Sequence, residues 1–325
     1  MSIPEANAIQ TKVAESANLA ASAPRQDYIP HICVCICTYK RPLPLSRLLR
    51  ELNTQVTGGL FTYSVVVIDN DSAQSGEATV AQMRLACAIP IQYAVEPRQS
   101  IALARNRAVA NADGDYIAFN DDDEFPAREW LHRLFTTCQQ YKVDGVLGPV
   151  RRHFDEAPPA WLKKSHLLDR KVNPTGMPVD WHEARTGNVL LKKDICAGDP
   201  GPFRPEFRSG SDTDFFRRKI EEGRSFVWSA DADVFEVLPP ARWSRSYYIK
   251  RALLTGAMEP KAPSFGIRDV LKSVIAIPLY VVALPFALLL GQHRFMSLLF
   301  SLCHHVGKML ALMGIHIVRG AYLTD

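Results

Sequence analysis

Four consecutive acidic residues follow a short apolar run near the middle of the chain. The run is Gly114–Phe119, and after Asn120 come Asp121, Asp122, Asp123 and Glu124. An apolar run of this length predicts a buried strand, and the carboxyl ends of strands are where open α/β sheets bind ligands. We therefore expect this strand to deliver carboxylates into a crevice.

Such a cluster of carboxylates has the chemistry of a divalent metal site. Neighbouring like charges repel one another unless their pKa values rise or a cation lies among them. Mg²⁺ and Mn²⁺ favour carboxylate oxygens and complete their shells with water and substrate phosphates. A strand continuing through Asp121 and Asp123 would place these two side chains on one face, with Asp122 pointing away. A solvated acidic turn is the alternative, and the position directly after an apolar strand favours the metal site.

The elements that would position these acids alternate between strand and helix patterns. The chain has 325 residues, 47% hydrophobic and 22% charged, which suits one large or two modest globular domains. We predict strands at 32–37, 63–68 and 91–95 and in the acid-tipped run, and helices at 44–52, 76–87, 100–110 and 127–141. This order is typical of an α/β fold with a mainly parallel sheet flanked by helices.

Two further polar groups follow the first and second predicted strands, where a nucleotide would bind. They are Thr38, Tyr39, Lys40 and Arg41, and then Asp69, Asn70, Asp71 and Ser72. Together they could stack on a base, accept its hydrogens and contact phosphate, although any α/β protein has polar loops there. The chain has no G-x-G-x-x-G or Walker loop, which argues against a dinucleotide dehydrogenase or a P-loop ATPase.

The cysteines indicate the redox compartment of the protein, and the charges are unevenly distributed along the chain. There are seven cysteines, none with the paired spacing of a zinc site, so we expect reduced thiols in a cytosolic protein. The net charge of +4 is uneven, because residues from 241 onward carry a local +7 and the first 240 residues carry −3. The basic end is also the apolar end.

Three regions are predicted: a mobile leader at 1–27, a catalytic domain at 28–240 and a basic, apolar helical region at 241–325. Within the last region, Val274–Leu290 is a run of 17 uncharged residues, and a second apolar stretch covers Phe295–Val318. A full membrane span needs about 20 apolar residues. We expect membrane association, by a hairpin dipping into the bilayer or by helices lying on it. A dimer interface or a core helical hairpin is the alternative.

Six motifs occur in order along the chain: Thr38–Arg41, Val67–Ser72, Glu96–Arg98 leading to Ala104–Asn106, Gly114–Glu124, Thr186–Asn188 and Gly210–Phe216. In these motifs the chain resembles the family 2 glycosyltransferases of the GT-A nucleotide-diphospho-sugar transferase fold. It is most similar to the succinoglycan-type glucosyltransferases that build exopolysaccharides.

The resemblance implies a role for eight residues. Thr38, Arg41 and Asp69 would line the nucleoside pocket, with Asp69 accepting from the base. Arg98 and Asn106 would support the nucleotide site. Asp121 and Asp123 match the two ends of the family's D-x-D, where Asp123 would ligate the Mg²⁺ or Mn²⁺ that bridges the diphosphate, and Asp212 matches the catalytic base.

One base without a covalent nucleophile implies inversion at the anomeric carbon. Asp212 would take the proton of the acceptor hydroxyl during attack, while the metal stabilises the departing diphosphate. The family often has Glu immediately before this aspartate, and Ser211 stands there instead. Ser211 and Asp212 also open a predicted helix, so an N-cap is the alternative for Asp212 and the expectation for Ser211.

The resemblance therefore implies an inverting, metal-dependent transfer from a UDP-sugar, with glucose as the expected sugar. The expected acceptor is a polyprenyl-diphosphate-linked saccharide in cell-surface polysaccharide assembly, at the cytoplasmic face of a bacterial inner membrane. Four basic residues could face the lipid's diphosphate or anionic lipid headgroups: Arg242, Arg245, Lys250 and Arg251. No nucleic acid partner is expected. The alternatives are a sugar-nucleotide nucleotidyltransferase, which would need a glycine-rich loop after the first strand, and a noncatalytic membrane-bound polysaccharide-binding protein.

Overall fold

A computed structural model of the chain describes residues 28–165, 167, 169–197, 201–207, 210–261 and 265–315. The predicted leader at 1–27 and the last residues of the second apolar stretch, 316–318, lie outside the described residues.

The core of the protein is a seven-stranded sheet in the order β3-β2-β1-β4-β8-β6-β9. β8 is antiparallel to both of its neighbours, and the remaining adjacent pairs are parallel. The prediction of a mainly parallel sheet is therefore confirmed. The strands are β1 (His31–Thr38), β2 (Thr62–Asp69), β3 (Ile91–Val95), β4 (Tyr116–Asn120), β6 (Gly145–Leu147), β8 (Asn188–Lys192) and β9 (Phe226–Trp228).

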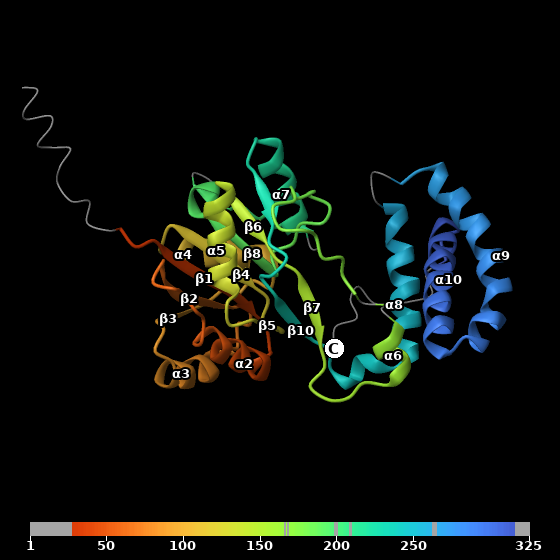
Figure 1. Cartoon of the computed structure of the whole chain (residues 1–325), viewed down its shortest axis with the longest axis horizontal. Helices are drawn as coiled ribbons and strands as arrows, with labels where there is room; N and C mark the ends of the chain where they lie inside the picture. The colour runs from red at the N-terminus through yellow and green to blue at the C-terminus, as the bar shows by residue number, and fades with distance from the viewer. Residues whose placement is uncertain are drawn as a thin grey trace, which may run out of the picture.

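Helices cover both faces of this sheet (Figure 1). α2, α3 and α5 bury their apolar side chains on the face that carries Ile32 and Val34, and α4 and α7 pack on the face that carries Cys33 and Cys35. All seven cysteines are free thiols. The helices of this part are α2 (Pro42–Leu52), α3 (Glu77–Ala86), α4 (Ile101–Asn111), α5 (Trp130–Tyr141) and α7 (Ser211–Glu221), with the 3-10 turn η1 (Lys193–Cys196). The short helix α6 (Ala160–Ser165) packs instead with the C-terminal helices.

β1 is the central strand of the sheet, and Gly114 packs closely against its first residue, His31. It lies between β2 and β4, which explains why its residues form a continuous apolar run rather than an alternating pattern. Gly114 leads into β4 with φ of 142°, and a Cβ there would stand 2.7 Å from the carbonyl oxygen of His31. Only glycine permits this close approach with that backbone conformation.

A second sheet of three strands connects the acidic residues to the C-terminal part. Its order is β5-β10-β7, with β10 antiparallel to β5 and parallel to β7. The predicted helix at 127–141 begins only at Trp130, because the preceding residues form β5 and the turn after it. The strands are β5 (Glu124–Pro126), β7 (Val150–His153) and β10 (Val234–Val237).

The C-terminal part is helical and lies to one side of the sheet (Figure 1). Trp161 and Leu162 of α6 form one apolar cluster with Tyr248 and Met296, so the helices after residue 240 pack against a segment from the middle of the chain. By length and apolar composition alone, α9 and α10 could each cross a membrane. The elements are η2 (Pro240–Trp243), α8 (Arg245–Met258), η3 (Glu259–Lys261), α9 (Ile267–Leu289) and α10 (Gln292–Leu312).

Candidate active site

The acidic residues lie in a turn between the two sheets. β4 ends at Asn120, and Asp121–Asp123 form the turn that leads into β5. The expectation that the strand continues and turns Asp122 away is wrong. Asp122 is buried and points to the end of β1, where Thr38 Oγ1 donates to its Oδ2 at 2.8 Å. The reason is that the chain leaves the pleated geometry at Asn120, so the strand alternation no longer applies.

Arg41 joins this turn to the start of α2. Its Nη1 lies 3.0 Å from Asp122 Oδ1 and 3.0 Å from Asp123 Oδ2. Lys40, just before it, has a left-handed φ of 55°, which turns the chain sharply between β1 and α2. Thr38, Arg41, Asp122 and Asp123 therefore form one hydrogen-bonded group at the carboxyl end of the central strands.

A cavity of about 670 Å³ opens beside this group. Its size is within the range of small-molecule sites, and its place at the carboxyl ends of parallel strands is where α/β sheets bind nucleotides. A neighbouring cavity of about 910 Å³ shares Tyr39, Arg41 and Gln99 with it and extends to Asp123 and Arg242. The first cavity is lined by Cys37, Thr38, Tyr39, Arg41, Asn70, Gln99, Ser100, Ile101, Asp122 and Pro205.

Asp69 does not line this cavity. It is fully buried, its Oδ1 accepts from the backbone N–H of Asp71 at 3.0 Å, and its Oδ2 accepts from Gly76 N–H at 2.7 Å and Tyr93 Oη at 2.9 Å. Asp69 thereby holds the loop after β2. Its direct contact with a base stays a prediction, and a base would have to share oxygens that already accept from the protein.

Asn70, the next residue, does line the cavity, and it holds a neighbouring loop in place. Its Nδ2 donates to the carbonyl oxygens of Glu96 and Arg98, both at 2.8 Å, and its Oδ1 accepts from Ser100 N–H at 2.9 Å. These bonds fix the segment between β3 and α4. Arg98 itself is 73% exposed, and its Nε donates to Glu96 Oε1 at 3.1 Å. It does not line the cavity in this structure, and its contact with a nucleotide stays a prediction.

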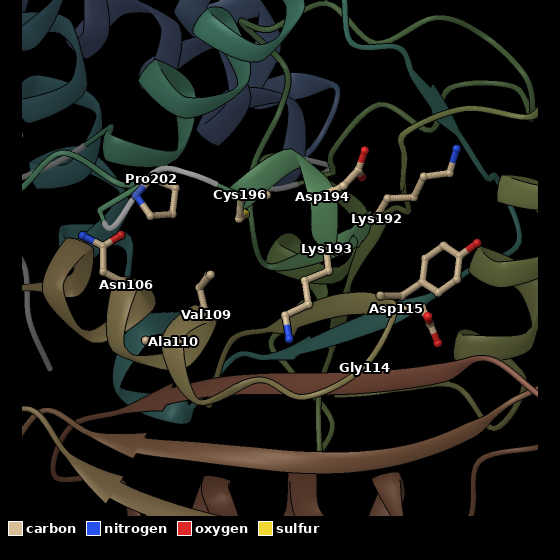
Figure 2. Close-up of a pocket in the computed structure, with 12 residues that line it drawn as sticks. Asn106, Val109, Ala110, Gly114, Asp115, Lys192, Lys193, Asp194, Cys196 and Pro202 are labelled. Atoms are coloured by element: carbon tan, nitrogen blue, oxygen red, sulfur yellow. The ribbon is translucent and has the colours of Figure 1, made fainter.

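Asn106 does not line the 670 Å³ cavity. Its Nδ2 donates to the carbonyl oxygen of Phe203 at 2.7 Å, and its Oδ1 accepts from Phe203 N–H at 2.8 Å. It also lines a cavity of about 690 Å³ that extends to the start of β4. Figure 2 shows Asn106 and Pro202 on one side of that cavity and Lys192 on the other. Asn106 therefore supports the segment that leads to α7.

Asp212 lies in the first turn of α7. Gly210, with φ of 82°, is the N-cap of this helix and makes no side-chain cap, so the expectation that Ser211 caps it is wrong. Ser211 instead accepts a hydrogen bond of 3.4 Å from Arg105 Nη1. Asp212 Oδ1 accepts from the N–H of Thr213 at 2.9 Å. This bond fixes the carboxylate at the amino end of α7.

Asp121 interacts electrostatically with Asp122 and Asp123 in the acidic turn and also with Asp212. Burial, together with the charges of Asp123, Asp122 and Asp212, raises the pKa of Asp121 to about 6, although the charge of Arg105 lowers it. Asp121 is therefore within electrostatic reach of both Asp212 and Arg105. The end of β4 and the start of α7 bring a carboxylate cluster and a separate aspartate to one site.

Sequence reasoning gave no role to Arg105 or Gly187. Arg105 is buried on α4, next to the predicted Asn106, and its guanidinium is the cation that opposes the rise in the pKa of Asp121. A Cβ on Gly187 would stand 3.0 Å from Asp121 Oδ2 and 3.1 Å from Glu124 Oε2. Glycine therefore leaves room for these two carboxylates. Both residues belong to the motifs of the family resemblance, but the sequence did not show which side chains they contact.

The donor set fits a hard divalent cation bound mainly through substrate. Within the described ranges, no group of three or more His, Cys, Asp or Glu side chains is arranged to hold a metal. Such ions need only one or two carboxylates when phosphates supply the other oxygens. Asp121 and Asp123 are two such carboxylates. Burial is the main cause of the raised pKa of Asp121, and the charges of Asp123, Asp122 and Asp212 add a repulsion that a cation would relieve.

Comparison with known proteins identifies the class of this fold and site. The glycosyl transferase family 2 model matches residues 33–206. The succinoglycan biosynthesis protein ExoM of Rhizobium meliloti (strain 1021) is 34% identical over 233 residues, which are 70% of this chain and 73% of ExoM. The chain belongs to glycosyl transferase family 2, which confirms the resemblance drawn from its motifs.

Solved structures confirm the GT-A-like fold. Mannosyltransferase PcManGT from Pyrobaculum calidifontis, in complex with GDP-Man and Mn²⁺, has a TM-score of 0.58 and 17% identity, with 90% of each chain covered. S. aureus TarS 1-349 in complex with UDP-GlcNAc has a TM-score of 0.51 and 13% identity, with 89% of this chain and 93% of the TarS 1-349 chain covered. At these identities the likeness concerns the architecture.

Proposed function

We propose that this protein is an inverting glycosyltransferase that transfers a hexose, with glucose as the first candidate, from a UDP-sugar to a lipid-linked saccharide. The observation that carries the proposal is the position of Asp121, which lies within electrostatic reach of both the Arg41-bound acids beside the nucleotide cavity and Asp212 on α7. The proposed donor site and the proposed base therefore lie close together, on either side of Asp121.

The donor would bind with its nucleoside in the cavity lined by Thr38, Tyr39 and Asn70. Its diphosphate would lie toward the acidic turn, where Asp121 and Asp123 would hold Mg²⁺ or Mn²⁺ together with phosphate oxygens. When bound, the ion would supply positive charge to the departing diphosphate. Arg41 keeps Asp123 in place through its 3.0 Å ion pair.

Asp212 would act as the general base. Its Oδ1 accepts from Thr213 N–H, and among the described residues no hydrogen bond to Oδ2 is found, so Oδ2 would accept the acceptor's hydroxyl proton. Deprotonation during attack makes the hydroxyl oxygen a competent nucleophile. Attack on the face opposite the leaving diphosphate inverts the anomeric carbon, so an α-linked donor gives a β-linked product.

The second cavity supports the choice of an anionic, lipid-linked acceptor. Of the four basic residues predicted to face the acceptor lipid, Arg242 lines the cavity that also contains Asp123. Arg245 and Arg251 lie on α8, where they donate to Gln292 Oε1 at 2.6 Å and Tyr247 Oη at 3.0 Å. We assign recognition of the acceptor's phosphate to Arg242 rather than to the α8 residues because Arg242 lines this cavity, although its Nη1 also pairs with Glu236 Oε1 at 3.6 Å. We further propose that the enzyme acts in exopolysaccharide assembly at the cytoplasmic face of a bacterial inner membrane, because its relative ExoM is a succinoglycan biosynthesis protein.

Donor turnover tests the proposal directly. Purified protein with Mn²⁺ and a polyprenyl-diphosphate-linked saccharide should release UDP from UDP-glucose, and GDP-mannose serves as the competing donor because PcManGT is solved with it. Binding of donor without release in the presence of a series of such acceptors would favour a noncatalytic binding protein. Arg242→Gln should raise the KM for lipid-linked acceptor, whereas the matched variant Arg245→Gln should leave it unchanged. Equal KM values in the two variants would contradict the assignment.

A further inference from the structure

One face of α9 exposes a continuous row of large apolar side chains. No residue between Lys272 and Arg294 is charged. Soluble monomers rarely expose apolar patches of this extent. At 1.5 Å per residue, α9 is about 35 Å long, so its length alone would allow it to cross a bilayer. The row consists of Leu271, Ile275, Leu279, Val282, Phe286 and Leu289, each more than half exposed.

The packing of α10 limits how α9 can meet a membrane. α8 and α10 lie side by side: a Cβ on Gly256 would overlap the carbonyl oxygen of His304, and a Cβ on Gly307 would overlap that of Leu253. Arg245 and Gln292 meet at the first residues of these two helices. α8 therefore accompanies α10, and it carries the exposed Lys250 and the half-buried Arg251. Crossing by α10 would bring charged residues of α8 into the hydrocarbon, where they are costly.

Earlier segments of the chain contact the α9–α10 hairpin at both of its ends. Near the turn, Ser297 Oγ donates to the carbonyl oxygen of Ser165 on α6 at 3.1 Å, and Met296 packs on Trp161. At the other end, Glu259 pairs with His304 at 2.8 Å and with Lys308. A crossing hairpin would leave its turn on the far side of the bilayer, and α6 would have to follow it there.

We propose that α9 lies in the plane of the membrane, with its outer face inserted in one leaflet and with α10 and α8 between it and the catalytic sheet. Figure 1 shows this succession, with α8 nearest the sheet and α9 farthest from it. The hairpin is thus a monotopic anchor rather than a pair of transmembrane spans.

The charges beside this face favour a bilayer containing anionic lipid. Arg268 and Lys272 are exposed in the first turns of α9, and Arg294 is exposed at the start of α10. Between residues 267 and 315 the sole acidic residue is Asp269, which accepts a 3.0 Å hydrogen bond from Gly266 N–H at the start of α9. Cations at both ends of the apolar row would contact lipid phosphates, and they would repel one another if two copies paired through this face.

Depth measurements distinguish the in-plane helix from a spanning one. The full-length protein, with a genetically encoded fluorescent amino acid at position 271, 279 or 286, is mixed with phosphatidylcholine–phosphatidylglycerol vesicles that contain nitroxide lipids of known depth. An in-plane helix predicts the same shallow depth at all three positions. A spanning helix places position 279 near the bilayer centre, about 12 Å deeper than position 271, and that result would overturn the proposal.

Matched variants test whether a bilayer, rather than a second copy, covers this face. Leu279→Lys combined with Val282→Lys should lower the fraction that floats with the same vesicles at least tenfold, with unchanged circular dichroism. Leu85→Lys alters a leucine on α3 that is 92% exposed and should float like the unaltered protein. If the unaltered protein fails to float, and the double variant converts a dimer to a monomer in sedimentation, the face is a dimer interface and the proposal fails. Neither assay requires sugar transfer, so the outcome is independent of the proposed function.

Discussion

Replacing Asp212 by asparagine would remove a proton acceptor while keeping the local structure. An asparagine Oδ1 can still accept from Thr213 N–H, the 2.9 Å bond that orients the side chain. Loss of a general base typically costs 10²- to 10⁴-fold in rate, which corresponds to roughly 3–5 kcal/mol of activation free energy. Loss of a negative charge from the first turn of α7 costs only about 0.3–1 kcal/mol of stability.

Donor binding should respond differently from turnover in this variant. The charge of Asp212 is one of the causes that raise the pKa of Asp121, so its removal lowers that pKa and leaves Asp121 more fully ionised. The affinity for donor with Mn²⁺ should therefore be unchanged or slightly higher, while kcat falls by the stated factor. Calorimetric titration of donor and initial-rate kinetics measure the two quantities. Glu221→Gln, an exposed acid at the far end of α7, is the control. A parallel loss of donor affinity in Asp212→Asn would refute the assignment of Asp212 as a base separate from the donor site.

Three further predictions concern the metal, the pH response and the helical part. Asp123→Ala should lower both donor affinity and kcat, by tenfold or more, and an effect on kcat alone would show that this carboxylate does not help to hold the donor. Protonated Asp121 cannot bind a cation, so donor affinity should fall as pH drops through about 6. Because the charge of Arg105 lowers the pKa of Asp121, Arg105→Gln should move this loss to higher pH in titrations from pH 5 to 8. Without a cation the same group makes the native state bind more protons than the unfolded state between pH 3.8 and about 6, so stability should fall as pH rises through that window. Gly307→Ala would force α8 and α10 apart and should cost about 1–3 kcal/mol in denaturant unfolding, whereas Gly266→Ala, where a Cβ meets open space, should cost less.

The elements predicted from hydrophobic patterning were those with long patterns. The strand expected at 91–95 matches β3, and the helix expected at 44–52 lies within α2. β5, with three residues, and β7 and β10, with four each, are too short to carry a period of their own. They form because neighbouring strands pair with them, so the second sheet was missed. Because β5 was not predicted, the turn that separates it from β4 was not predicted either, and the burial of Asp122 in that turn was missed.

What the sequence determined was the order of the elements and the presence of acids at the carboxyl end of a buried strand. Those features depend on neighbouring residues, because periodicity and chain breaks act over a few positions. What only the tertiary structure decided was which charges meet. Arg105 and Ser211 are 106 residues apart and hydrogen-bonded, and Asp121 reaches Asp212 because α7 packs against β4 on one face of the sheet. Contacts of that kind arise from the burial of apolar faces shared by distant elements, which no local pattern encodes.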